Sequence, residues 1–239
     1  MHPRYGRRLS LSLDQGLLLA TSSWLLPTLT ILVSMLVHLY NGARAVPFFI
    51  SEADYAGLEG HVFTVGLTVA GFVQMTYAWH LYHSLEVEHE GLWVLATVFG
   101  LVASANTVLV SQYDMYDFIN PHIASAMLAF GGGVVWAYLA QRALGNYASI
   151  RGASIRRRGF LMAFWGFVIM VISFEFAVSS FDPTGMSTEA FLNEAQRGIR
   201  IAAPAEYILV GGLMVCLASF RHELMEQASQ GASRTNEAS

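Results

Sequence analysis

NGARAVPFFISEADYAGLEGHVFTV, residues 41–65, lies between the first two long apolar runs of the chain, and every other segment is placed relative to it. It holds a proline and a β-like run at 46–50. Four ionisable residues follow, Glu52, Asp54, Glu59 and His61. A connector that only joined two membrane spans would not need three carboxylates and an imidazole at this place. We therefore expect the loop to take part in a polar site.

The composition indicates a membrane protein. Of 239 residues, 54% are hydrophobic and only 13% are charged, whereas soluble domains carry about 25% charged residues. A water-soluble fold could not hide this much apolar surface. The thirteen basic residues are all arginine, which excludes a lysine Schiff base and with it a retinal photoreceptor. The single cysteine, Cys216, excludes an intrachain disulfide.

Six apolar runs are long enough to cross the membrane, since about 20 apolar residues span roughly 30 Å of hydrocarbon. The runs are 16–40, 60–83, 91–112, 118–144, 159–180 and 201–220. They predict an all-α fold, a polytopic membrane protein with six transmembrane helices in one bundle covering 16–220. Residues 1–15 form an N-terminal segment, and 221–239 form a tail that we expect to be disordered beyond Gln227.

The placement of arginine predicts the orientation. With both termini inside, the inner segments hold ten arginines and the outer segments hold three. This asymmetry favours cytoplasmic termini and places 41–59, 113–117 and 181–200 outside. A cluster at 151–158 lies on the inner side. It is best explained as a topology signal, and contact with anionic lipid headgroups is the alternative.

Ionisable and polar side chains gather toward the predicted outer half of the bundle, where burial costs several kcal/mol unless they are paired or hydrated. They are His38, Glu52, Asp54, Glu59, His61, Asn106, Asp114, Asp117, His122, Glu175 and Glu206. Any one of them is best explained as a helix cap or a hydrated group. For the set as a whole, a shared ligand or reaction site is as good an explanation as separate structural roles. Glu175 lies roughly 8 Å inside its span, where water is scarce.

A second cluster lies toward the inner side. His80 and His83 share a helix face, and Glu86, Glu88, His89 and Glu90 follow, so a carboxylate could complete a zinc site with the two histidines. An interfacial belt explains them better, because tryptophan and tyrosine stand beside them. The chain has no GxSxG, phosphate-loop or HExxH motif. We expect no metal, no cofactor and no nucleic-acid partner.

Three motifs resemble the FRAG/DRAM/SFK family. The first is PFFISE at 47–52, with Glu59 and the VF pair at 62–63. The others are Asn106 followed by the NPH of 120–122, and AAPAEY at 202–207. Their order and spacing match from about residue 24 to 220. The chain departs from the family at Leu58, where a proline often stands, and at 54–55, where small residues are common.

This resemblance implies a six-span protein with both ends cytoplasmic. The family includes lysosomal autophagy modulators, the yeast Sfk protein that assists a phosphoinositide kinase, and Golgi proteins needed to remodel the lipid of GPI anchors. Lipid is the common theme, and no settled catalytic set accompanies it. The motif positions carried over are Ser51, Glu52, Glu59, His122 and Glu206. The resemblance implies the cell membrane for a prokaryotic member, and an endomembrane or the plasma membrane for a eukaryotic one.

We therefore expect a lipid-handling protein whose outer polar pocket binds a phospholipid or glycolipid headgroup and assists its remodelling. An enzyme of this kind would hydrolyse or transfer acyl groups, with Ser51 as nucleophile and His61 or His122 as base. The orienting partner of that base would be Glu52, Asp54 or Glu206. The expected ligand-binding residues are Asp54, Glu59, Asn106, Glu175 and Glu206.

The alternative is a non-catalytic adaptor that regulates a membrane partner enzyme through the arginines at 151–158. A channel or transporter is the least favoured class, because no span carries repeated charges and no paired broken helices occur.

Overall fold

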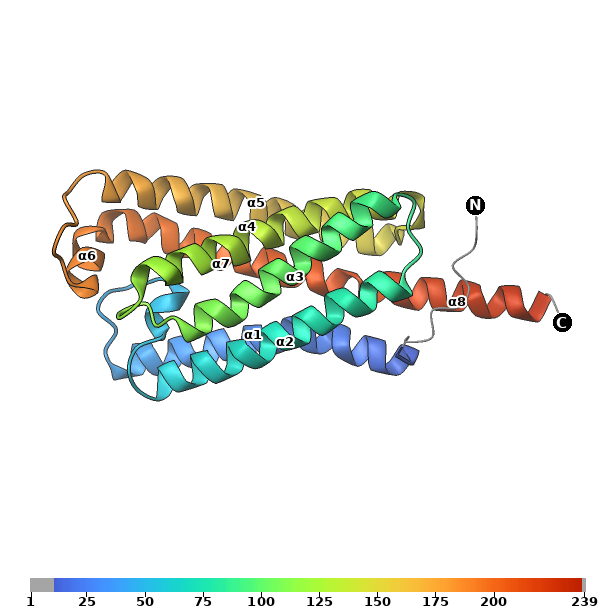
Figure 1. Ribbon diagram of the computed structural model, residues 1–239, viewed down its shortest axis with the longest axis horizontal. Helices are drawn as coiled ribbons and strands as arrows, with labels where there is room; N and C mark the ends of the chain where they lie inside the picture. Colours follow the sequence, from blue (N-terminus) through green and yellow to red (C-terminus); the bar gives the residue numbers. More distant parts are fainter. Residues whose placement is uncertain (1–10, 238–239) are drawn as a thin grey trace.

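The computed structural model describes residues 11–237, and that part of the chain is all-helical, without a strand (Figure 1). Six helices are long and apolar enough to cross a membrane, which confirms the predicted six-helix bundle. They are α1 (Leu13–Asn41), α2 (Leu58–Ser84), α3 (Glu90–Gln112), α4 (Ile119–Leu144), α5 (Ile150–Val178) and α7 (Gln196–Ser219). The side of the membrane on which each terminus lies stays a prediction.

Four shorter elements lie at the two ends of the bundle. The 3-10 helix η1 (Ile50–Ala53) and α6 (Thr188–Glu194) lie at one end, here called the loop end (Figure 1). The 3-10 helix η2 (Gly145–Tyr147) and α8 (Arg221–Glu237) lie at the other, the tail end. Helix α8 continues the direction of α7 beyond the bundle. The tail, for which we expected disorder beyond Gln227, is therefore helical as far as Glu237.

Side-chain caps set several helix starts. Ser12 and Gln15 form a capping box at the start of α1, and Ser187 accepts a bond from the Ala190 amide at the start of α6. Ser149 accepts from the Gly152 amide at the start of α5. Because of this cap, α5 begins nine residues before the predicted apolar run at 159, and the arginines of 151–158 lie in its first turns.

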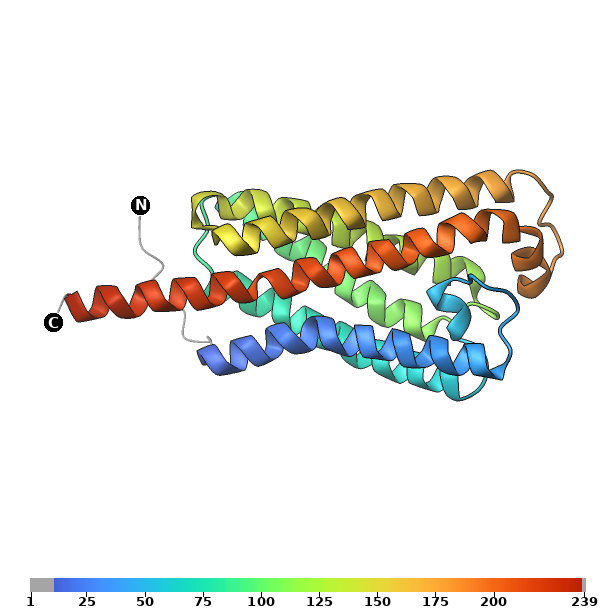
Figure 2. The same cartoon turned by 180° about the vertical axis from the view of Figure 1, so that it is seen from behind.

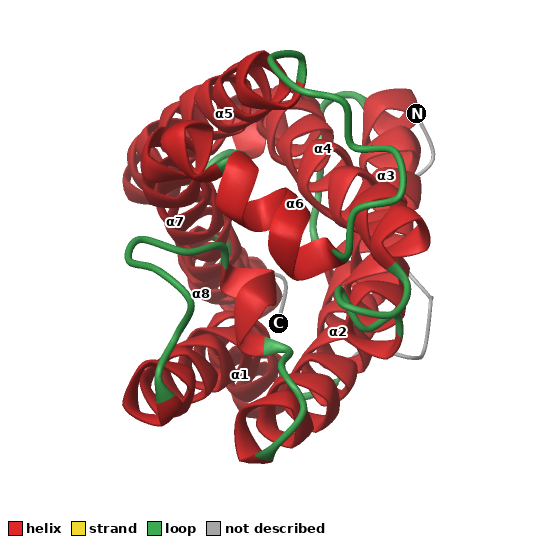
Figure 3. Ribbon diagram, turned by 90° about the vertical axis from the view of Figure 1, so that its left-hand side faces the viewer, coloured by secondary structure: helices red, strands yellow, loops and turns green. Residues whose placement is uncertain are grey.

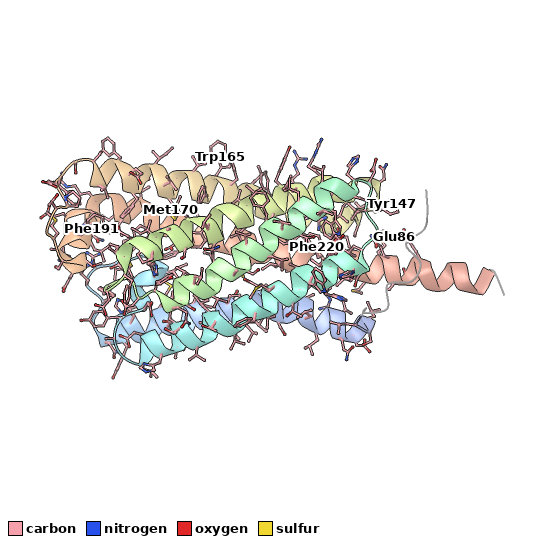
Figure 4. The ribbon with its side chains drawn as sticks, in the orientation of Figure 1. Glu86, Tyr147, Trp165, Met170, Phe191 and Phe220 are labelled. Atoms are coloured by element: carbon pink, nitrogen blue, oxygen red, sulfur yellow. The ribbon has the colours of Figure 1, made fainter. Side chains whose placement is uncertain are left out.

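The six long helices form a ring (Figure 3). Helices α1 to α4 pack in chain order, and α5 and α7 make the most extensive pair. Contacts of α7 with α1 and α4, and of α4 with α5, are sparser. The large apolar side chains on the outside are those expected to face lipid: Trp165 points away from the bundle in Figure 4, whereas Met170 and Phe220 are buried.

The α5–α7 pair is held by close backbone approach. A Cβ atom at Gly212 would lie 2.5 Å from the Ala163 nitrogen and the Gly159 carbonyl oxygen. One at Gly166 would lie 2.6 Å from the Leu209 nitrogen. Membrane helices gain little from the hydrophobic effect against each other, so such contacts between small residues provide the van der Waals attraction that pairs them.

A buried ion pair closes the tail end. The Arg156 side chain is fully buried and donates to Glu223 at 2.7 Å, to Ser219 at 3.1 Å and to Gln141 at 2.8 Å. Its guanidinium also lies 4.3 Å from the centre of the Phe220 ring. Arg156 therefore joins α5 to α4, α7 and α8.

We expect Gly212→Ala to lower the free energy of unfolding by about 1–3 kcal/mol, because the new methyl group collides with the α5 backbone. The adjacent Gly211 is the matched control, since a Cβ there would have no neighbour within 4 Å. Thermal unfolding of both variants in detergent measures the difference. Equal melting temperatures for the two variants would show that the α5–α7 contact does not hold the pair.

Candidate functional site

The loop between α1 and α2 turns back into the ring of helices. In Figure 2 this loop, drawn in blue, lies against α7. Phe48, Phe49 and Ile50 are buried, and so are Glu52 and Ala53. The run at 46–50, β-like in sequence, forms no strand; it leads as irregular chain into η1. The loop end of the bundle is therefore filled by non-helical backbone and one 3-10 turn.

Side chains from other elements bond to the backbone of this loop. Glu206 accepts from the Ile50 amide at 2.7 Å. Four further side chains donate to loop carbonyls: Gln196 to Pro47, Tyr207 to Phe48, Tyr116 to Glu52, and Ser34 to Ala53. Non-helical backbone is stable near the hydrocarbon only where protein satisfies its polar groups. The fold meets that condition with residues from α1, α7 and the α3–α4 connector.

The side chain of Glu52, within the loop itself, also helps to hold the loop in place. Its carboxylate is fully buried, and Oε2 accepts from Arg44 at 2.9 and 3.1 Å. Oε1 accepts from the Phe49 amide at 2.9 Å. Arg44 also donates to Asn193 in α6. The structure thus places Glu52, predicted as a catalytic group or the partner of a histidine, in an ion pair that holds the loop.

Asp54 is the other buried acid of the loop. One oxygen accepts a long bond of 3.4 Å from Thr64, and the other has no partner. The pKa of Asp54 is raised to about 7, chiefly by burial and also by the nearby charge of Asp114, while the hydrogen bond from Thr64 lowers it. The Asp54 carboxyl therefore changes charge near neutral pH.

A central cavity of about 120 Å³ lies within the ring and is lined mainly by apolar side chains. Toward the loop end it is lined by three polar residues from three elements: Ser51 of η1, His122 of α4 and Glu206 of α7. Toward the tail end it reaches Tyr77 and Trp136. Of all the predicted site residues, these three are the ones that the structure brings to one cavity.

The hydrogen bonds of His122 fix the state of its ring. Nδ1 lies 2.6 Å from the Tyr113 carbonyl oxygen, which can only accept, so Nδ1 carries the proton. In the neutral ring Nε2 is then a free acceptor, and it is buried without a partner. Ser51 donates to the sulfur of Met115 at 3.1 Å. An imidazole in this tautomer can accept a proton from a hydroxyl in the cavity.

Three predicted residues lie elsewhere. His61 is exposed and bonds to the Gly57 carbonyl at 2.6 Å. Asn106 is buried but donates to Val102 within its own helix at 2.8 Å. Glu175 is exposed on α5. None of the three lines either of the two cavities described here.

Glu59, another predicted ligand-binding residue, lies beside a second cavity. Its carboxylate is 2% exposed, and Oε2 accepts from Asn41 at 2.9 Å. Oε1 lies 3.7 Å from Nδ1 of His38, too far for a hydrogen bond. This second cavity, here called the loop-end pocket, has a volume of about 290 Å³. Its lining includes His38, Arg44, Tyr55, Glu59, Tyr116 and Glu189.

Sequence reasoning missed several residues of these cavities. Arg44 was counted only as a topology signal, and Tyr55 and Tyr116 were not singled out. The small residues Ala126 and Ala129 line the central cavity on α4. Their signal, a run of small residues after the NPH motif, is also what close helix packing would produce. Among the described residues, no three His, Cys, Asp or Glu side chains are grouped to hold a metal ion.

Comparisons of the chain with models of protein families, with curated proteins and with solved structures find no match. The resemblance to the FRAG/DRAM/SFK family thus rests on the sequence motifs.

The raised pKa of Asp54 predicts a pH-dependent stability. The folded state keeps the proton up to about pH 7, whereas an unfolded aspartate loses it near pH 4. The contribution of Asp54 to the free energy of unfolding therefore falls as pH rises from about 4 to 7. We expect Asp54→Asn to raise the melting temperature in detergent at pH 8 by about 3 °C or more, and to change it little at pH 4.

The control for this variant is Asp117→Asn, because Asp117 is exposed in the same part of the bundle. A melting temperature of Asp54→Asn that follows the wild type at every pH would contradict the assignment.

Proposed function

We propose that the protein is an integral membrane lipid-handling protein that holds the apolar tail of a lipid in the central cavity, with the ester or amide group that joins this tail to the headgroup at Ser51, His122 and Glu206. The observation that carries this proposal is the form of the cavity. It is mainly apolar, with Gln74, Ser104 and Thr107 as further polar lining residues, and it has acceptor and donor groups at the loop end. A lipid has the same division into an apolar tail and a polar end, so it matches the cavity at both ends.

The cavity is long enough to hold a lipid tail. On α4 its lining runs from His122 to Trp136, a distance of about 21 Å at 1.5 Å per residue. The hydrocarbon core of a bilayer is about 30 Å thick, so one leaflet is about 15 Å. A tail in the cavity would lie parallel to the helices, at the depth at which lipid tails lie in the membrane.

The polar groups at the loop end suit acyl transfer. The Ser51 oxygen would attack an ester or amide carbonyl while His122 Nε2 takes the proton of the Ser51 hydroxyl. His122 would then give that proton to the alcohol or amine that leaves. Glu206 is engaged by the Ile50 amide, so it would fix the loop that carries Ser51. Remodelling of a bound lipid therefore extends the binding function, in keeping with the lipid theme of the resembling family.

The test is mass spectrometry of the lipids that co-purify with the full chain. Ala126 lines the cavity, and Ala126→Phe fills it. We expect this variant to retain about a tenth or less of the lipid that the wild type retains. The matched control is Ala124→Phe, because Ala124 is exposed on the same helix. Equal lipid retention in both variants, with melting temperatures like the wild type, would refute the proposal.

The reaction is tested with His122→Ala on added phospholipid. Lyso-lipids or exchanged acyl chains formed by the wild type alone would identify an enzyme. If the wild type and His122→Ala both bind a lipid and leave it chemically unchanged, the protein is a lipid-binding protein in which His122 is not catalytic.

A second candidate function is a non-catalytic adaptor at the tail end. Arg151, Arg157 and Arg158 are exposed there, whereas Arg156 is occupied by Glu223. An adaptor would lose partner proteins when the three exposed arginines are replaced by glutamine, with little change in stability. Arg156→Gln would instead lower the free energy of unfolding by about 3–5 kcal/mol, since it leaves Glu223 buried and unpaired. Unchanged localisation and co-purifying proteins in the triple variant would remove the adaptor hypothesis.

A further inference from the structure

We propose that the loop-end pocket binds an ammonium group, the amine of a lipid headgroup. This inference rests on the proposed lipid-handling function and names the headgroup chemistry. The pocket and the central cavity share no lining residue: Ile50 and Ser51 of η1 line the central cavity, whereas Arg44 and Tyr116, which both bond to Glu52, line the pocket. Because the pocket lies at the end of helices long enough to span the hydrocarbon, we expect it at the level of the lipid headgroups.

The charges around the pocket favour a cation. Arg44 is the one arginine in its lining, and its charge is balanced by the buried Glu52 at 2.9 Å. The carboxylates of Glu59 and Glu189 remain. A phosphate placed here would face two carboxylates with no uncompensated positive charge, whereas an ammonium group would meet opposite charge.

His38 is a second, independent observation in favour of a ligand in this pocket. The residue is 5% exposed, and neither ring nitrogen has a hydrogen-bond partner. It contributes to the lining of the pocket, with Nδ1 at 3.7 Å from Oε1 of Glu59. A buried imidazole without partners is costly. An ammonium group between the two side chains would donate to the Glu59 oxygen and to a ring nitrogen of His38 that carries no proton, and so would give both a partner.

Two tyrosines complete the surroundings of such a group. The rings of Tyr55 and Tyr116 lie with their centres 5.0 Å apart, edge to face at 85°. Both residues are part of the pocket lining. Aromatic faces attract cations through their electron density, and they add nothing for an anion. Carboxylate, imidazole and aromatic rings are together the partners expected for an amine.

The experiment compares two lipids that differ in the headgroup. The full chain in detergent is titrated with dioleoyl phosphatidylethanolamine and with dioleoyl phosphatidylglycerol, and bound lipid is counted by native mass spectrometry. Both lipids carry the same tails and a phosphate, but only the first has an amine. We expect the wild type to bind the ethanolamine lipid about tenfold more tightly, as one charge-assisted hydrogen bond would give.

Glu59→Gln removes the charge and keeps an oxygen for Asn41. We expect this variant to bind the ethanolamine lipid about tenfold more weakly and the glycerol lipid as tightly as the wild type does, so that the preference is lost. Glu194→Gln is the matched control, because Glu194 is exposed at the same end of the molecule and outside the pocket. If Glu59→Gln does not fold, Glu189→Gln takes its place, since Glu189 is exposed and its loss should reduce the preference several-fold.

Equal binding of the two lipids by the wild type would overturn the ammonium site and leave the proposed lipid function standing. A preference for the glycerol lipid would also overturn it, and would indicate an anion site. Binding of neither lipid would overturn both proposals. A preference that survives in both glutamate variants would place the amine elsewhere on the protein.

Discussion

Non-helical backbone at the edge of a membrane must find its hydrogen bonds within the protein, and the loop between α1 and α2 is subject to this constraint. Its amide and carbonyl groups bond to side chains of Ser34, Tyr116, Gln196, Glu206 and Tyr207. These partners come from widely separated parts of the sequence. The conformation of the loop therefore depends on all of these partners together, because the loss of any one of them leaves a buried polar group of the backbone without a hydrogen bond.

The two cavities follow from how this loop fills the ring. Helices α5 and α7 approach closely through glycines, and α1 to α4 pack in chain order. The ring is wider than its side chains can fill, and η1 occupies it only at the loop end. The mainly apolar central cavity is lined in part by Ile50 and Ser51 of η1, and the more polar loop-end pocket shares none of its lining residues. The loop end thus holds two distinct cavities of different polarity.

The sequence predicted the six helices because each apolar run is long enough to cross the hydrocarbon as a helix. It also placed His122 and Glu206 at a similar depth, since depth follows from position along a span. The face of each helix was not predictable: helices that are apolar all round have no polar stripe to mark the interior. Glu175 therefore proved exposed. The pairing of Glu52 with Arg44 was missed because it depends on how an irregular loop folds back.

Helices α7 and α8 form a nearly continuous rod, since Phe220 between them keeps helical backbone angles. The stretch of 35 residues from Gln196 to Gln230 measures about 52 Å, against a hydrocarbon thickness of about 30 Å. One part of this rod carries Glu206 beside η1, and another carries Glu223, bound to Arg156. Because one helical rod carries both the partner of the Ile50 amide and the partner of Arg156, a displacement of α8 along the rod axis would shift the contacts at both ends of the bundle together.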